Sequence, residues 1–89
     1  MEIAFDLTKD AINVRKHGVS LRRAKDFDLD AAAYKIDDSQ DYGEVRYRAL
    51  GFLDARLHSL MFTQDGDTLR AISLRKADKD EEKEYRENY

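Results

Sequence analysis

Hydrophobic and polar residues alternate along three consecutive stretches in the second half of the chain. Ranges 44–53, 56–63 and 68–76 show the period of two that is typical of strands with one buried face. The connections between them have the length of hairpin turns. In the first stretch one face carries Val45, Tyr47 and Ala49, and the other carries Glu44, Arg46 and Arg48. The pattern predicts three antiparallel strands with an apolar face and a charged face.

The first third of the chain has the periodicity of a strand followed by two helices. Residues 2–6 alternate, and residues 9–17 predict a helix capped by Thr8 and ended by Gly18. The expected core-facing stripe of this helix is Leu7, Ala11, Val14 and Gly18. Ser20 is positioned to cap a second helix over 21–27, whose inward residues are expected to be Leu21, Ala24 and Phe27.

Three further segments complete the predicted architecture. Residues 31–36 are expected to form a strand, residues 37–43 a polar loop, and residues 77–88 a closing helix with a thin apolar stripe of Ala77, Tyr85 and Tyr89. We therefore expect an α+β fold in a single small domain over residues 1–89. An antiparallel sheet would carry two N-terminal helices and one C-terminal helix packed on its apolar face.

Composition excludes several classes of protein. The 89 residues contain no cysteine, which excludes a disulfide framework and a thiolate metal site and fits a reducing cytoplasm. No apolar run reaches the 18 residues of a membrane-spanning helix, and the acidic first residues do not resemble a signal peptide.

The net charge of −3 conceals strong segregation along the chain. Residues 9–25 carry a net charge of +5 and residues 45–76 a net charge of +3, whereas residues 26–44 carry −6 and residues 77–89 carry −3. The two basic segments can converge on one face and attract a polyanion. The alternative is a well-mixed, solvated surface, which composition alone favours.

The run Arg15-Lys16-His17-Gly18 concentrates groups that hold phosphate or move protons. Histidine has a reference pKa of about 6.5 and can act as acid or base near neutral pH. Helical geometry directs Lys16 away from the predicted core stripe and places His17 on its border. The alternative for His17 is a residue that only stabilises the helix dipole.

The charged faces of the predicted strands supply further candidates. Glu44 and Arg46 can place a base beside a phosphate clamp, with Arg48 next to them; surface ion pairing is the alternative.

Arg70 and Arg75 have opposite parity, so both face one site only if a bulge or the end of the strand intervenes. Arg75 is the better site candidate, and Ser73 on its face can hydrogen-bond phosphate. His58 lies in an apolar run and is expected to be packed and hydrogen-bonded.

Several motifs occur together in an order that resembles the BrnT family of bacterial toxins across nearly the whole chain. They are Phe5-Asp6, Asn13-x-Arg15-Lys16-His17-Gly18-Val19-Ser20, Gly43-Glu44-x-Arg46, Gly51, Arg70-x-Ile72-Ser73-x-Arg75-Lys76-Ala77, and Glu82 with Tyr85. The resemblance implies a RelE-like fold and a type II toxin that cleaves RNA without a metal or other cofactor. It also implies inhibition of translation and growth. The implied partner is a BrnA-type ribbon-helix-helix antitoxin, and the complex would bind operator DNA through that antitoxin.

The chain departs from the family pattern in three places. Leu7 stands where the family usually has tryptophan, and Arg23 where it often has glutamate. The family often has an arginine after the threonine of the central strand, and here Gln64 follows Thr63. If that arginine binds the scissile phosphate, this chain would be a weakened nuclease that acts mainly by binding its antitoxin in operon repression.

The sequence therefore leads to one set of candidate site residues, with no metal among them. We expect His17 and Glu44 to transfer protons and Arg46 and Arg75 to act with them in catalysis. Substrate binding is assigned to Arg15, Lys16, Arg48 and Ser73. The rival hypothesis is a binding module that has lost cleavage.

Overall fold

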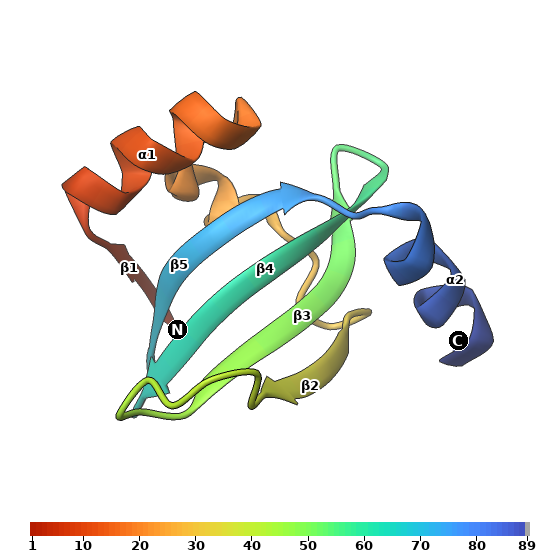
Figure 1. Cartoon of the computed structure of the whole chain (residues 1–89). Coiled ribbons are helices and arrows are strands. Elements are labelled where there is room, and N and C mark those ends of the chain that lie inside the picture. Colours follow the sequence, from red (N-terminus) through yellow and green to blue (C-terminus); the bar gives the residue numbers. More distant parts are fainter. Residues whose placement is uncertain (89) are drawn as a thin grey trace.

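The structure is a computed structural model that describes residues 1–88. These residues form a mixed β-sheet with helices packed against it (Figure 1). The elements are β1 (Glu2–Phe5), α1 (Leu7–His17), the 3₁₀ helix η1 (Leu21–Asp26), β2 (Ala33–Asp37), β3 (Arg46–Leu53), β4 (Arg56–Asp65), β5 (Thr68–Lys76) and α2 (Lys79–Asn88). Within these residues no helix is long and apolar enough to cross a membrane. The α+β class and the three-strand meander β3–β4–β5 are confirmed.

The five strands found in residues 1–88 lie in the order β1-β5-β4-β3-β2. The pairs β2–β3, β3–β4 and β4–β5 are antiparallel, but β1 runs parallel to β5 with Glu2 opposite Thr68. The expectation of a purely antiparallel sheet was wrong at this edge. Side-chain alternation is the same in both kinds of pairing, so the pattern of residues 2–6 carries no information on direction.

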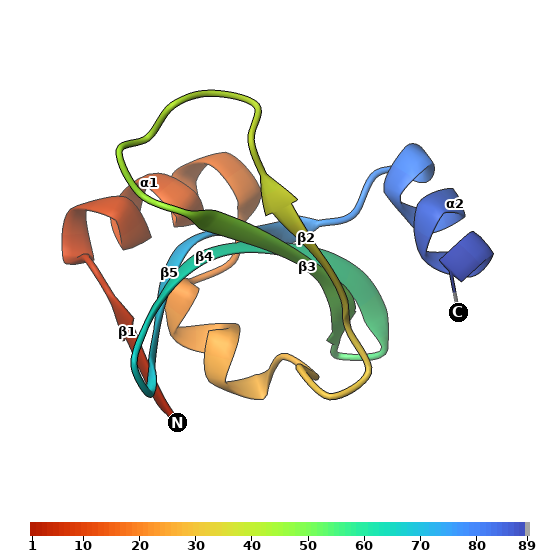
Figure 2. The same cartoon turned by 90° about the horizontal axis from the view of Figure 1, so that it is seen from below.

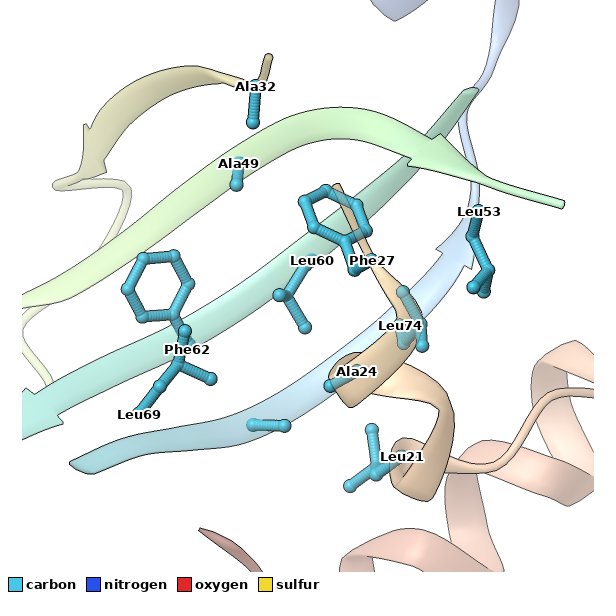
Figure 3. Packing of buried hydrophobic residues seen from close by; sticks show 11 residues of the cluster. Leu21, Ala24, Phe27, Ala32, Ala49, Leu53, Leu60, Phe62, Leu69 and Leu74 are labelled. Atoms are coloured by element: carbon cyan, nitrogen blue, oxygen red, sulfur yellow. The ribbon is translucent and has the colours of Figure 1, made fainter. Parts of the chain in front are cut away.

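The core lies on one face of the sheet, under η1 (Figure 3). Leu21, Ala24 and Phe27 are all buried and point at the sheet, as expected. The expected second helix forms as a 3₁₀ helix. Its three residues per turn put residues spaced by three on one line, which is the spacing of its apolar side chains. Phe27 fits because Gly51 lies below it: a Cβ at Gly51 would be 2.7 Å from the Phe27 ring.

Helix α1 packs through polar side chains rather than through the expected stripe. Leu7 and Val14 are 72% and 45% exposed, and Ala11 is also exposed, whereas Asn13 is buried. The cap is Asp6, whose carboxylate accepts the Lys9 N–H at 3.0 Å; the expected cap Thr8 was wrong. Gly18 closes the helix with φ 73°, as expected.

Asn13 anchors α1 to the outer edge of β5, beyond the point where β1 ends. Its amide nitrogen donates to the carbonyls of Leu74 and Val19, both at 2.8 Å, and its oxygen accepts the Leu74 N–H at 3.1 Å. The side chain thus imitates a neighbouring strand at one residue. Polar anchoring of this kind overrode the apolar periodicity, because it satisfies backbone groups of β5 that would otherwise be buried and unpaired.

Replacing Asn13 by alanine is expected to lower the free energy of unfolding by about 2–4 kcal/mol, since buried backbone groups lose their partners. Val14→Ala is the matched control on the same helix, and it is expected to change stability by less than about 0.5 kcal/mol because Val14 is 45% exposed. Urea unfolding followed by circular dichroism measures both. Equal effects of the two variants would contradict this account of α1.

Helix α2 lies on the face of the sheet opposite to η1, whereas all helices were expected on the apolar face (Figure 2). It is held by polar contacts and by a ring contact, in which Tyr85 meets Phe52 edge-on with ring centroids 5.5 Å apart. The Tyr85 hydroxyl donates to the Ala31 carbonyl at 2.8 Å. Of the expected stripe, Ala77 precedes the helix, Tyr85 packs against Phe52, and Tyr89 lies outside the described residues.

Candidate functional site

Helices α1 and α2 flank the sheet near its two ends (Figures 1 and 2). The strand register places several cations on the face of the sheet opposite to η1. Cross-strand partners share a face, and the register places Lys35, Arg48, Met61 and Ser73 in one row across β2–β5. The next row holds Leu50, Ser59 and Arg75. We call this surface the basic face and define it by Lys35, Arg46, Arg48, Arg70, Ser73 and Arg75.

A β-bulge brings Arg70 onto the basic face. The register between β4 and β5 shifts at Met61 and Phe62: Met61 pairs with Ser73 but Phe62 pairs with Ala71, which leaves Ile72 as an extra residue. Thr63 then pairs with Arg70, while Ser59 pairs with Arg75. The parity conflict between the two arginines is therefore removed by a bulge, one of the two conditions that the sequence had left open.

The basic face continues onto α1 across a hollow of about 220 Å³. Its lining consists of Lys9, Ile12, Asn13, Lys16, His17, Ile72 and Ser73. Two of the expected site residues of α1, Lys16 and His17, therefore lie beside Ser73 of the bulged strand. Arg15 is exposed and is not among the lining residues.

The environment of His17 favours its neutral form. Partial burial, and after it the charges of Arg75 and Lys16, lower the pKa of His17 below its ordinary value of 6.5. Each cause disfavours the imidazolium, so at neutral pH the ring is mostly uncharged and able to accept a proton. Arg75 and Lys16 lie near His17 and can attract a polyanion to it. This favours a role for His17 in a binding site over a role limited to stabilising the helix dipole.

Two arginines of the basic face are bound by carboxylates of α2. Both Glu81 oxygens accept from Arg75, at 2.7 and 3.0 Å, and Glu84 pairs with Arg48. Glu81 also caps α2 reciprocally with Asp78. The acidic last segment of the chain therefore lies against the basic strands β3 and β5, so part of the charge segregation seen in the sequence ends in ion pairs.

The pKa values of Glu81 and Arg75 reflect this pairing. Burial alone would raise the pKa of Glu81, but the hydrogen bonds from Arg75 and from the Asp78 N–H lower it below 4.5. The hydrogen bond to Glu81 raises the pKa of Arg75 in turn. Arg48 differs, because its Nε is buried with no hydrogen-bond partner among the described residues. Among residues 1–88, the outer end of this guanidinium is held in an ion pair by Glu84 alone.

Glu44 and Arg46 lie at the other end of the basic face. Arg46 donates to Glu44 at 3.2 Å and stacks over the Tyr42 ring at 3.9 Å. Leu50 of β3 lies in the same cross-strand row as Arg75. Arg46 comes four residues before Leu50, which is about 13 Å along the strand. The structure therefore brings His17, Lys16, Ser73 and Arg75 together but does not place Glu44 beside His17.

Five residues that shape the site were not predicted from the sequence. Lys9, Ile12 and Ile72 line the hollow, and Glu81 and Glu84 hold the arginines. The pattern Asp78-x-x-Glu81 was a visible capping signal for Glu81. Nothing in the alternation of β5 indicated the bulge. His58 is buried, with Nδ1 2.8 Å from the Arg56 carbonyl oxygen, as expected for a packed histidine.

A family model and a solved structure that resemble this chain both belong to BrnT toxins. A family model described as "Ribonuclease toxin, BrnT, of type II toxin-antitoxin system" matches residues 5–81. The structure is similar to the 1.1 Å crystal structure of the Brucella abortus ribonuclease toxin BrnT. The TM-score is 0.67 and the identity 25%, over 89% of this chain and 99% of that one. No curated protein matches the chain.

Proposed function

The chain belongs to the BrnT family of ribonuclease toxins of type II toxin–antitoxin systems, and on that premise we propose that it is a metal-independent endoribonuclease acting in the cytoplasm. The observation that carries the proposal is the meeting of His17, whose pKa is lowered, with Lys16 and Arg75. A neutral imidazole beside two cations suits proton removal next to a phosphate.

The proposed reaction is attack of a ribose 2′-hydroxyl on the adjacent phosphorus. His17 accepts the 2′-hydroxyl proton, the O2′–P bond forms, and the P–O5′ bond breaks. Lys16 lines the same hollow as His17 and is the proposed proton donor to the leaving 5′-oxygen. The products are a 2′,3′-cyclic phosphate and a 5′-hydroxyl end.

The charge that grows on the phosphorane is assigned to Arg75 and Arg48, with Ser73 as a hydrogen-bond donor. Arginine suits this role because its fork holds two phosphate oxygens at once. A well-placed donor of this kind contributes about 2.7–4 kcal/mol to transition-state stabilisation. Since these arginines carry the charge, the proposed step requires no metal ion. The substrate phosphate must compete with Glu81 and Glu84 of α2 for them.

The far end of the basic face is assigned to the RNA backbone. Arg46 and Arg70 would contact phosphates away from the cleaved bond, and Glu44 would orient Arg46 through their ion pair. Arg70 pairs with Thr63 across the ladder, next to the position where the family arginine is absent. It offers a cation in that neighbourhood from the adjacent strand. Arg15 extends the positive field on the exposed side of α1.

The proposed partner is a BrnA-type ribbon-helix-helix antitoxin, and we propose that the pair binds operator DNA only through it. Without the antitoxin, RNA cleavage would stop translation and growth. A second function has one observation in its favour, the pairing of Arg48 and Arg75 with α2 carboxylates. In that case the chain would cleave weakly and would act mainly by binding its antitoxin in repression.

Expression with and without the neighbouring antitoxin gene separates the two functions. The nuclease proposal expects growth arrest with degraded RNA when the toxin is expressed alone, and recovery of both when the antitoxin is added. Normal growth with intact RNA, together with operator binding by the purified pair, would favour the repression function instead.

A further inference from the structure

The hollow between α1 and β5 is lined by both apolar and cationic side chains. Ile12 projects from α1 and is 42% exposed, and Ile72 is the extra residue of the bulge; both line the hollow. Lys9 and Lys16 also line it, and no ion pair holds either lysine among residues 1–88. None of the described lining residues carries a carboxylate. Such a site suits a flat, apolar ring that is attached to an anion.

The size of the hollow narrows the choice of ligand. About 220 Å³ is below the range of roughly 300–1,000 Å³ that is typical of sites for whole small molecules. One nucleobase fits this scale better than a complete cofactor. The walls are also fixed, since Asn13 binds the Leu74 backbone at both its N–H and its carbonyl. A rigid wall lowers the entropy lost when a ligand binds.

The position of the hollow connects it to the proposed cleavage site. His17 and Ser73 belong to both, so a nucleotide in the hollow would lie next to the reacting phosphate. The bulge contributes to this site, because its extra residue Ile72 lines the hollow together with Ser73. Bulges occur often next to active sites, where they redirect side chains.

We propose that this hollow is a subsite for one nucleotide adjacent to the cleaved bond, with its base on Ile12 and Ile72 and its phosphate on Lys9. The inference rests on the proposed nuclease function, because it names the substrate contacts of the same site. It adds Lys9, Ile12 and Ile72 as residues that determine affinity for the neighbouring nucleotide.

The test measures binding rather than cleavage. Fluorescent 2′-O-methyl RNA hexanucleotides, which lack the attacking hydroxyl, are titrated with the whole protein in EDTA by anisotropy. In a matching series one position at a time carries a sugar without a base. Loss of one particular base is expected to weaken binding to the native protein. Ile12→Ala should weaken binding of the complete hexanucleotide about fivefold and should reduce the effect of removing that base, since only Ile72 then remains under it.

One control variant changes a residue of α1 outside the hollow, and the other changes a lysine on the opposite face of the sheet. Val14→Ala, at 45% exposure on α1, should leave affinity and base dependence unchanged. Lys9→Gln should lower the slope of log affinity against log salt by about 0.7, whereas Lys25→Gln on η1 should not. The subsite is overturned if the native protein fails to bind the oligonucleotides, or if Ile12→Ala and Val14→Ala behave alike.

The two proposals fail separately in this design. If the native protein binds with the expected dependence on Ile12 but never cleaves ordinary RNA, the nuclease function fails and the subsite stands. If it cleaves RNA and no base position depends on Ile12, the subsite fails and the nuclease function stands.

Discussion

His17→Ala is expected to lower the rate of RNA cleavage by about 10²–10⁴-fold and to abolish growth arrest while the protein stays folded. His17 is exposed at the end of α1. Its removal therefore costs little packing but takes away the proposed proton acceptor. Cleavage rates of purified native and variant protein under single-turnover conditions measure the effect, and circular dichroism checks the fold.

The proposed role of His17 as a base also predicts how the cleavage rate changes with pH. A base works when it is unprotonated, and burial with the charges of Arg75 and Lys16 lowers the pKa of His17 below 6.5. The rate should therefore rise with pH along a limb that lies below 6.5. Lys16→Gln removes one cause of the lowered pKa, so an NMR titration of the His17 ring should move to higher pH. His58→Asn is the control and should leave the limb in place. A limb at or above 6.5 in the native protein contradicts the assignment.

The second large effect concerns Arg48 and Glu84, whose substitutions should act in opposite directions. Arg48→Gln removes a charge donor and should lower the cleavage rate by about 10²-fold or more. Glu84→Gln releases Arg48 from its ion pair and should strengthen RNA binding severalfold, because the phosphate no longer competes with a carboxylate. Binding and single-turnover rates of the two variants measure this.

Glu87→Gln is the matched control for Glu84→Gln. It changes the same side chain by the same charge on the same helix, but Glu87 pairs with Lys83 rather than with the basic face. If general repulsion between α2 and RNA were the cause, both substitutions would strengthen binding equally. Weaker binding after Glu84→Gln would show that the ion pair supports the site instead of masking it.

Elements defined by local chemistry could be predicted from the sequence. The bounds of β5, residues 68–76, and the inward residues of η1 were predicted correctly because spacing alone determines them. Gly18 was recognised as a helix end because a left-handed residue there favours glycine. The parallel pairing of β1 and the burial of Asn13 in place of Val14 depend on β5, more than 50 residues away, and no local pattern carries them.

Some residues of the candidate site could likewise be predicted from the sequence, and others could be found only in the folded structure. His17, Lys16, Ser73 and Arg75 were chosen as chemistry-bearing residues of the matched motifs, and the structure places them together. Their grouping with Glu44 assumed that a shared strand face means a shared site, although a strand extends about 3.3 Å with each residue. The role of α2 required tertiary information, since only the folded chain brings Glu84 to Arg48.

Incubation of the purified protein with a defined RNA in EDTA tests the central proposal most directly. We expect internal cleavage that leaves 2′,3′-cyclic phosphate and 5′-hydroxyl ends, and nearly intact RNA with His17→Ala at the same concentration. Intact RNA with the native protein, or equal cleavage by His17→Ala, would contradict it.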